Sequence, residues 1–228
     1  MRGLGVVLVS LLIIGLFESI GCGSKQIESP TSPTPMPASA QVLFKDDFSN
    51  DSSGWDIYSD AKGMAFYQNG WLHVRNNAIN EGSDVSYANQ YFTDFVLEVE
   101  TKLVDGSEDN WHYVAFRADG PMDCYLFEIS ADGYYAMVKY VNGSRIVFEG
   151  PTKSTYIKQG RDMINTVRVE ALGSDLRLFV NGHVLGNVND STFTGGDIGL
   201  GASLPEGTPL SGSQFTEVAF DNITVTVP

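Results

Sequence analysis

Residues 125–148 read YLFEISADGYYAMVKYVNGSRIVF, three apolar and aromatic runs that two turn dipeptides separate. The dipeptides are Asp132-Gly133 and Asn142-Gly143. Such pairs supply the positive φ that a two-residue hairpin turn needs, so the stretch predicts a meander of three antiparallel strands. These strands are Tyr125–Ser130, Tyr134–Val141 and Arg145–Phe148.

The same pattern continues on both sides of this meander. Tyr113–Ala118 adds a strand before it, and Asn181-Gly182 predicts a third tight hairpin after it, between Leu176–Asn181 and His183–Val188. Val167–Ala171 precedes that hairpin as a further strand. The chain contains no convincing helix of three turns, and more than ten short strands in one domain predict an all-β fold of two stacked antiparallel sheets.

Residues 95–102 show how such a sheet divides its side chains. Phe95, Leu97 and Val99 alternate with Glu98, Glu100 and Lys102. Successive side chains of a strand point to opposite faces, so one face of this strand packs against the core and the other meets water or a ligand.

The chain before residue 42 has a different composition. Residues 1–22 combine Arg2, an apolar run from Leu4 to Phe17 and small residues before Cys22, which together resemble a bacterial lipoprotein signal. That resemblance implies that the protein is exported and held to a membrane by a lipid on Cys22. Residues 23–41 are rich in Pro, Ser and Thr and predict an extended spacer, and residues 42–228 form one globular domain.

Charge and cysteine content narrow the possible partners of this domain. Two cations and two acids cancel before residue 42, so the net charge of −14 belongs to the globular region, and nucleic acid is not expected as a partner. Cys124 is the one cysteine after Cys22, so the domain has no internal disulfide, and its position among apolar residues predicts a buried core thiol.

Four stretches of the domain resemble the concanavalin A-like lectin and glucanase jelly rolls, and among them the laminin G-like and 3-keto-disaccharide hydrolase domains. They are Asp46-Asp47-Phe48 with Gly54-Trp55; Tyr113–Arg117 leading to Tyr125–Ile129 and Asp132–Tyr135; Val167–Glu170 with Leu178–Gly182; and Ala219–Ile223. Taken in this order, the four stretches span nearly all of residues 42–228. The resemblance implies a two-sheet jelly-roll sandwich and an association with carbohydrate.

A hydrolase would need two carboxyl groups about 5 to 10 Å apart. Relatives with this fold carry theirs in an E-x-D-x-x-E pattern on a strand, but here residues 98–103 read EVETKL, so that motif is absent. Alternating Glu and Lys is typical of a solvated, salt-bridged strand. If the domain is a hydrolase, Glu98, Glu100 or Glu128 supplies the acid or base.

Other catalytic classes lack their motifs. His73, His112 and His183 are isolated, without H-x-x-x-H or H-x-H spacing, and the chain has no G-x-S-x-G elbow. It also has no glycine loop of the phosphate-cradling kind before a helix, so a nucleotide partner is not expected.

The central meander carries side chains suited to a saccharide, which is recognised by aromatic rings and by polar groups that bond its hydroxyls. Strand alternation places Tyr113 and Arg117 on one face, and likewise Tyr135 and Lys139. The candidate ligand-binding residues are Trp111, Tyr113, Arg117, Glu128, Tyr135 and Lys139. Each of them is alternatively a core or ion-pair residue.

A structural Ca²⁺ is a further expectation, since relatives with this fold often hold one where the first and last strands meet. Asp47 opens the domain and Asp221 lies near its end, and hard cations prefer such oxygen ligands. The alternative is that both acids serve only as polar strand ends.

The sequence therefore favours a surface-tethered carbohydrate-binding or cell-surface interaction module without catalysis of its own. One alternative is a glycoside hydrolase acting on a modified, 3-keto-type disaccharide. The other is a structural or protein-binding domain of the laminin G-like kind.

Overall fold

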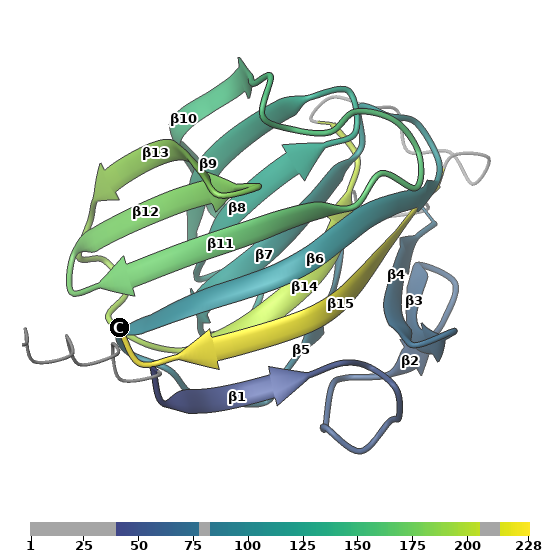
Figure 1. Cartoon of the computed structure of the whole chain (residues 1–228), viewed down its shortest axis with the longest axis horizontal. Helices are drawn as coiled ribbons and strands as arrows, with labels where there is room; N and C mark the ends of the chain where they lie inside the picture. The colour runs from purple at the N-terminus through teal and green to yellow at the C-terminus, as the bar shows by residue number, and fades with distance from the viewer. Residues whose placement is uncertain (1–39, 78–82, 206–214) are drawn as a thin grey trace, which may run out of the picture. The chain divides into compact units, whose positions relative to one another are not determined.

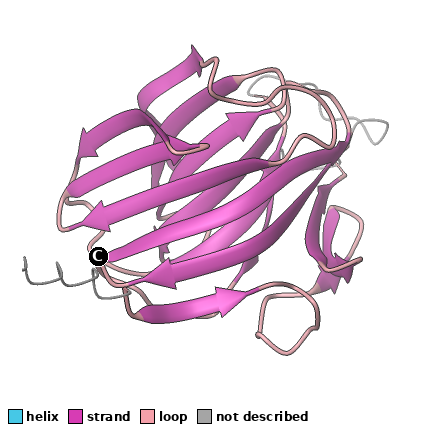
Figure 2. Ribbon diagram, viewed as in Figure 1, coloured by secondary structure: helices cyan, strands magenta, loops and turns pink. Residues whose placement is uncertain are grey.

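The computed structural model describes residues 40–77, 83–205 and 215–228. Their regular structure is all strand (Figures 1 and 2), and none of these residues belongs to a helix long and apolar enough to cross a membrane. Cys22 lies outside the described residues, and so do the signal and almost all of the predicted spacer. The lipid anchor therefore stays a prediction.

The strands form two antiparallel sheets (Figure 1). The nine-stranded sheet runs in the order β13 (His183–Asn189), β12 (Asp175–Val180), β11 (Asn165–Leu172), β6 (Phe95–Asp105), β15 (Thr216–Thr226), β4 (Trp71–Asn76), β3 (Gly63–Gln68) and β2 (Tyr58–Ser59), and β1 (Val42–Asp46) pairs with β15. The six-stranded sheet runs β10 (Ser144–Lys153), β9 (Tyr134–Val141), β8 (Cys124–Ser130), β7 (Trp111–Ala118), β14 (Asp197–Ser203) and β5 (Ser83–Tyr87). This arrangement confirms the predicted two-sheet jelly roll.

The main core lies between the two sheets. Strand β6 shows the predicted alternation, because Phe95, Leu97 and Val99 are buried in that core while Glu98 is exposed. The core also takes Val114 and Phe116 from β7, so both sheets contribute one face to it.

Two of the three predicted hairpin turns have the expected form. Asn142 and Gly143 both have positive φ, at 48° and 76°, and Val141 pairs with Ser144. Asn181 and Gly182 likewise have φ of 49° and 80°. These are the two-residue turns that match the twist of the flanking strands.

The turn at Asp132-Gly133 is different, and here the prediction of a two-residue turn was wrong. Only Gly133 has positive φ, its N–H donates to the carbonyl of Ser130 at 3.1 Å, and Ile129 pairs with Tyr135. The loop therefore holds the three residues 131–133, where a two-residue loop would have paired Ala131 with Tyr134. The strand register consequently differs by one residue, which exchanges the two faces of β9 relative to β8.

A second apolar cluster lies on the six-stranded sheet. Its buried members come only from β7, β8, β9 and adjoining positions, and they alternate with the residues that enter the main core. They therefore occupy the outer face of this sheet, the side turned away from the nine-stranded sheet. The buried members are Trp111, Tyr113, Ala115, Ala118, Cys124, Leu126, Ala136 and Val138.

Candidate functional site

Three of the predicted ligand residues meet on the outer face of the six-stranded sheet. Tyr113 on β7 pairs with Glu128 on β8, and Trp111 pairs with Ser130 on the same two strands. Trp111 is 8% exposed and Tyr113 is 4% exposed, so both side chains are buried within the outer cluster.

The ring of Tyr113 crosses β14 at a glycine. A Cβ at Gly201 would lie 2.2 Å from Cζ of Tyr113, so only glycine leaves room for the ring there. The Tyr113 hydroxyl lies 2.7 Å from Oγ of Ser83 and donates to the carbonyl oxygen of Asp84 at 2.9 Å. Burial raises the pKa of Tyr113, so the phenol is neutral. Packing over Gly201 fixes the ring, and the contacts with Ser83 and Asp84 fix the hydroxyl.

Glu128 is paired with an arginine that the sequence analysis did not select. Arg145 on β10 donates from Nη2 to Oε2 of Glu128 at 3.0 Å, reaching across β9. The side chain of Glu128 is 4% exposed, whereas that of Arg145 is 24% exposed. Ala136 pairs with Glu128 on the intervening strand, and its small side chain leaves space for this contact.

Three tyrosines that the sequence analysis also missed lie half-buried against the outer cluster. Tyr134 and Tyr140 on β9 pack against the outer cluster, and Tyr87 on β5 does so on the opposite side. Lys153 lies with Nζ 5.3 Å from the ring centroid of Tyr134. A three-residue turn at 131–133 places Tyr134 and Tyr140 on the same face as Glu128. Predicting that turn length would therefore have identified both tyrosines as candidate ligand residues.

Tyr135 and Lys139 lie on the other face of β9, toward the interior of the sandwich. The Tyr135 hydroxyl lies 2.6 Å from Oε1 of Glu149. Lys139 donates from Nζ to Oδ2 of Asp190 at 2.7 Å. The prediction that placed Tyr135 and Lys139 in one ligand site with Glu128 is therefore corrected. The strand register after the β8–β9 turn puts both residues on the opposite face of the sheet from Glu128.

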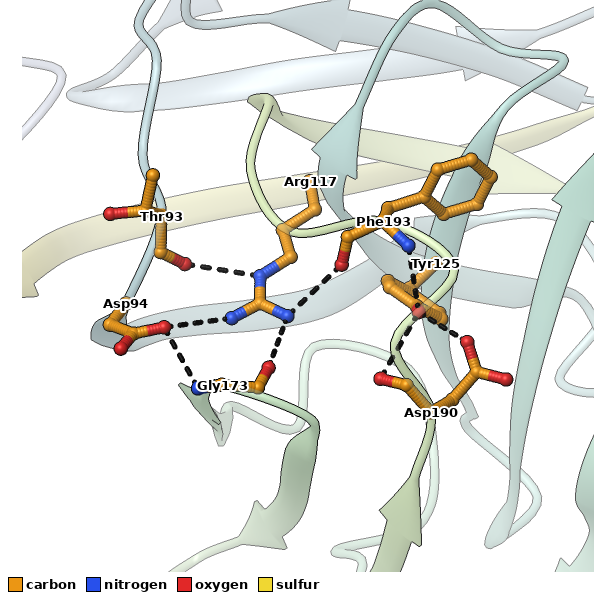
Figure 3. Close-up of polar contacts among 7 residues, drawn as sticks. All are labelled: Thr93, Asp94, Arg117, Tyr125, Gly173, Asp190 and Phe193. Atoms are coloured by element: carbon orange, nitrogen blue, oxygen red, sulfur yellow. Dashed lines mark hydrogen bonds and ion pairs between the residues drawn. The ribbon is translucent and has the colours of Figure 1, made fainter.

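Arg117 also leaves the predicted face. It has φ of 48° and sits where the β7–β14 register shifts, so the alternation from Tyr113 stops at this bulge. Its side chain is 0% exposed. Figure 3 shows the guanidinium donating to the carbonyls of Thr93 at 3.0 Å, Gly173 at 2.7 Å and Phe193 at 3.1 Å, and to Oδ1 of Asp94 at 3.1 Å.

The same close-up shows a second set of bonds around Tyr125. Its hydroxyl contacts Asp190 and accepts from the backbone N–H of Phe193 at 3.2 Å (Figure 3). Together with Arg117, this network ties the segment 190–193 to both sheets. Arg117 therefore belongs to the framework of the fold.

The three candidate acids do not converge. Glu98 and Glu100 project from β6 on the outer face of the nine-stranded sheet, where Glu98 pairs with Arg168 and Glu100 accepts from Nδ2 of Asn222 at 3.1 Å. Glu128 lies on the opposite outer face of the sandwich. No two of these acids from different strands flank one site.

The first and last strands meet as predicted, with Asp46 of β1 opposite Ile223 of β15. Burial raises the pKa of Asp221, and the neighbouring charges of Glu100 and Asp47 raise it further. Within the described ranges, no three His, Cys, Asp or Glu side chains are grouped to hold a metal ion. The structural Ca²⁺ stays a prediction, for which we expect a melting temperature that rises with Ca²⁺ and falls back with EDTA.

Comparison with solved structures gives the same fold at low sequence identity. The carbohydrate-binding module CBM66 from Bacillus subtilis matches with a TM-score of 0.61 and 18% identity, over 76% of this chain and 96% of that one. An endo-β-galactosidase from Clostridium perfringens that releases GlcNAcα1-4Gal matches with a TM-score of 0.59 and 12% identity, over 85% and 64% of the two chains. A β-glucanase from Bacillus licheniformis matches with a TM-score of 0.58 and 11% identity, over 84% and 100%.

No curated protein sequence matches the chain. A family model does: that of the 3-keto-alpha-glucoside-1,2-lyase-like domain matches residues 39–226, which includes both sheets and every candidate residue of the folded domain. The chain therefore belongs to the family of 3-keto-alpha-glucoside-1,2-lyase-like domains.

Proposed function

We propose that the folded domain binds a saccharide on the outer face of its six-stranded sheet and performs no catalysis of its own. The observation that carries the proposal is the arrangement around Glu128, in which one arginine–carboxylate pair lies among Trp111, Tyr113 and the half-buried Tyr134 and Tyr140. Saccharides are bound by such a combination of ring faces and a few fixed polar groups.

The known folds around this chain support a role with carbohydrate. CBM66 is a carbohydrate-binding module and the β-glucanase is a glycan-cleaving enzyme, and both share the fold with this chain. A fold alone leaves the activity open, so the side chains on the proposed face decide the choice. They offer the aromatic rings and polar groups that saccharide binding needs, whereas the candidate acids Glu98 and Glu100 lie on the far side of the sandwich from Glu128.

The second candidate function is the cleavage of a 3-keto-type disaccharide, which the family match over residues 39–226 favours. Here Glu128 would act as the acid or base, because it is the candidate acid that lies among the aromatic residues. The pairing of its Oε2 with Arg145 stabilises the ionised carboxylate.

We further propose that the domain is exported and displayed on a membrane by a lipid on Cys22, with residues 23–41 as a spacer. Support comes from the sequence before residue 42, whose charged start, apolar run and cysteine are followed by a proline-rich stretch. Mass spectrometry of the mature N-terminus tests this, since a diacylglyceryl group adds a large, known mass to Cys22.

A glycan array and a turnover assay separate the candidate functions. We expect the protein to bind one or more glycans and to release no sugar from a panel of 3-keto-disaccharides. Release of sugar that is lost in a Glu128→Gln variant would establish the enzyme instead. No binding and no turnover would overturn both and favour a structural or protein-binding domain.

A further inference from the structure

We infer that Tyr91 is a further saccharide-stacking residue, which extends the proposed binding face of the six-stranded sheet beyond the end of β5. The ligand that it serves is an oligosaccharide, because one sugar cannot reach both Tyr91 and the strands of that face. The inference rests on the proposed function and adds the class of ligand to it.

Tyr91 is 73% exposed, the highest value among the large hydrophobic residues that the structure describes. The next residue, Phe92, is buried in the main core. Neighbouring side chains of an extended segment point to opposite sides, so Tyr91 points away from that core, to the side of the outer cluster. Single exposed aromatic residues are common on protein surfaces, so the way in which Tyr91 is held decides its role.

The segment that carries Tyr91 is tied to the chain that enters β14. Phe92 and Gly196 exchange two backbone hydrogen bonds, each of 2.9 Å. The carboxylate of Asp197 accepts from the backbone N–H groups of residues 89–90, both at 3.1 Å. The backbone around Tyr91 is therefore fixed before any ligand arrives, and little conformational freedom is lost on binding.

The Tyr91 side chain itself rests on a glycine. A Cβ at Gly195 would lie 2.6 Å from Oη and 2.9 Å from Cζ of Tyr91. The end of the ring therefore packs on the main chain of Gly195, while most of the side chain stays open to solvent. An aromatic ring that is exposed and held in one place is the group on which the apolar face of a sugar stacks.

The same arrangement recurs on β14, within the proposed face. A Cβ at Gly199 would lie 3.0 Å from Cε1 of Tyr87, which packs against the outer cluster. Gly195 precedes Gly199 by four residues, a distance on the order of 10 Å in nearly extended chain. One sugar ring cannot bridge that separation, so a ligand that stacks on Tyr91 and also occupies the proposed face contains several sugars.

Charge decides between a saccharide and a nucleic acid, whose bases also stack on exposed aromatic rings. The carboxylates of Asp56 and Asp197 both accept hydrogen bonds from Asn89, two residues before Tyr91. The chain as a whole carries a net charge of −14. This negative charge opposes a polyphosphate and favours an uncharged oligosaccharide.

The test measures how affinity depends on the length of the glycan. The probes are neutral glucan and galactan oligosaccharides, from single sugars to hexasaccharides, titrated into wild type and Tyr91→Ala. We expect Tyr91→Ala to bind the longest oligosaccharides about tenfold more weakly, and the shortest that bind as tightly as wild type does. Tyr91→Phe keeps the ring and should bind every length like wild type.

Two further variants separate the position of the ring from a general effect of mutation. Gly195→Ala should also weaken binding of the long oligosaccharides, because its Cβ displaces the end of the Tyr91 ring. Tyr156→Ala removes a tyrosine that is 47% exposed in the loop after β10, and it should bind like wild type.

The outcomes distinguish this inference from the proposed function. Binding of every length by Tyr91→Ala as tightly as by wild type would overturn the inference and leave the proposed function standing. An equal loss at every length would also overturn it, since Tyr91 would then contact the same sugar as the rest of the face. No binding of any oligosaccharide by wild type would overturn the proposed function itself, and the inference with it.

Discussion

Arg117 and Arg145 are both arginines of the six-stranded sheet with an acidic partner, yet the structure uses them in opposite ways. Arg117 is fully buried, and three of its four bonds go to backbone carbonyls of loops that join different strands (Figure 3). Arg145 keeps 24% of its side chain exposed and bonds to the side chain of Glu128. The acidic partner is exposed in the first pair, at 54% for Asp94, and buried in the second.

This difference separates an arginine of the framework, Arg117, from an arginine of the proposed saccharide-binding face, Arg145. Where a guanidinium satisfies main-chain oxygens, its loss leaves polar groups of the fold without partners, and no single second change restores them. Where a guanidinium pairs with a buried carboxylate, its loss removes a charge partner of that carboxylate, and neutralising the carboxylate offsets the loss. The two sites can therefore be told apart by mutation.

The largest effect is expected at Arg117. Arg117→Ala should lower the free energy of unfolding by about 3 kcal/mol or more, because three carbonyls lose their donor. In a domain of this size that corresponds to a fall in melting temperature of roughly 6 to 12 °C, measured by calorimetry. Adding Asp94→Asn should recover none of it. The control is Arg177→Ala, whose side chain is 51% exposed and 3.8 Å from Glu170, with an expected loss below about 1 kcal/mol.

A smaller effect is expected at Arg145, and it should be reversible. Arg145→Gln should cost about 1 to 3 kcal/mol, since the buried Glu128 loses a charge partner. The double variant Glu128→Gln with Arg145→Gln should regain most of this stability in urea unfolding. A double variant as unstable as the single one would place Arg145 in the framework beside Arg117 and remove the contrast.

The network beside Arg117 also predicts an acid-dependent stability. Burial raises the pKa of Asp190, but the bonds from Lys139, Tyr125 and Thr192 outweigh it and hold that pKa below its usual value of 3.8. The unfolded state therefore takes up the proton first, so this stability is present above pH 3.8 and is lost as the pH falls below it. One such group gives a slope of up to about 1.4 kcal/mol per pH unit.

Asp190→Asn should flatten that slope between pH 4 and pH 2, measured by urea unfolding at each pH. Equal slopes in wild type and Asp190→Asn would contradict the role assigned to the network.

The smallest effects are expected in the two turns that flank β9. Gly133→Ala and Gly143→Ala each force a residue with a Cβ into positive φ, at 95° and 76°, which costs about 1 kcal/mol. At Gly143 the new Cβ would meet only the last two atoms of Met122, Cε at 2.4 Å and Sδ at 3.3 Å, and this exposed side chain can swing away. At Gly133 the new Cβ would meet Gln159 along more of its length, with Nε2 at 2.7 Å, Cδ at 3.0 Å and Cγ at 3.1 Å, so that variant should melt at the lower temperature of the two. The reverse order in thermal melts would show that the flexible Gln159 side chain gives way.

The sheet pattern could be predicted from the sequence because alternation and turn dipeptides are local signals. Phe95, Leu97 and Val99 predict their buried face directly, and Asn142-Gly143 predicts its own register. The candidate site could be predicted only in part, because it depends on which residues of different strands lie opposite one another. Asp132-Gly133 matches a two-residue turn in sequence but forms a three-residue one, and that single residue moves Tyr134 and Tyr140 onto the face of Glu128.

Arg117 shows a second limit of alternation. The pattern from Tyr113 places Arg117 on the same face, but the bulge at Arg117 interrupts the period, and no turn residue in the sequence marks it. Arg145 was missed for a related reason, since its partner Glu128 lies two strands away and 17 residues earlier in the chain. Such a contact follows from the sheet order and not from sequence spacing.

The central claim, saccharide binding on the outer face of the six-stranded sheet, can be tested with the three tryptophans of the chain, which report on three different regions. Trp111 lies on the proposed face. Trp71 lies on the outer face of the nine-stranded sheet, where Nζ of Lys102 is 4.1 Å from its ring centroid. Trp55 is buried, and its Nε1 donates a hydrogen bond to Asp46. In a titration of the ¹⁵N-labelled protein with a glycan that binds on the array, we predict that the indole resonance of Trp111 shifts while those of Trp71 and Trp55 stay in place. A shift of Trp71 with Trp111 unchanged would contradict the account.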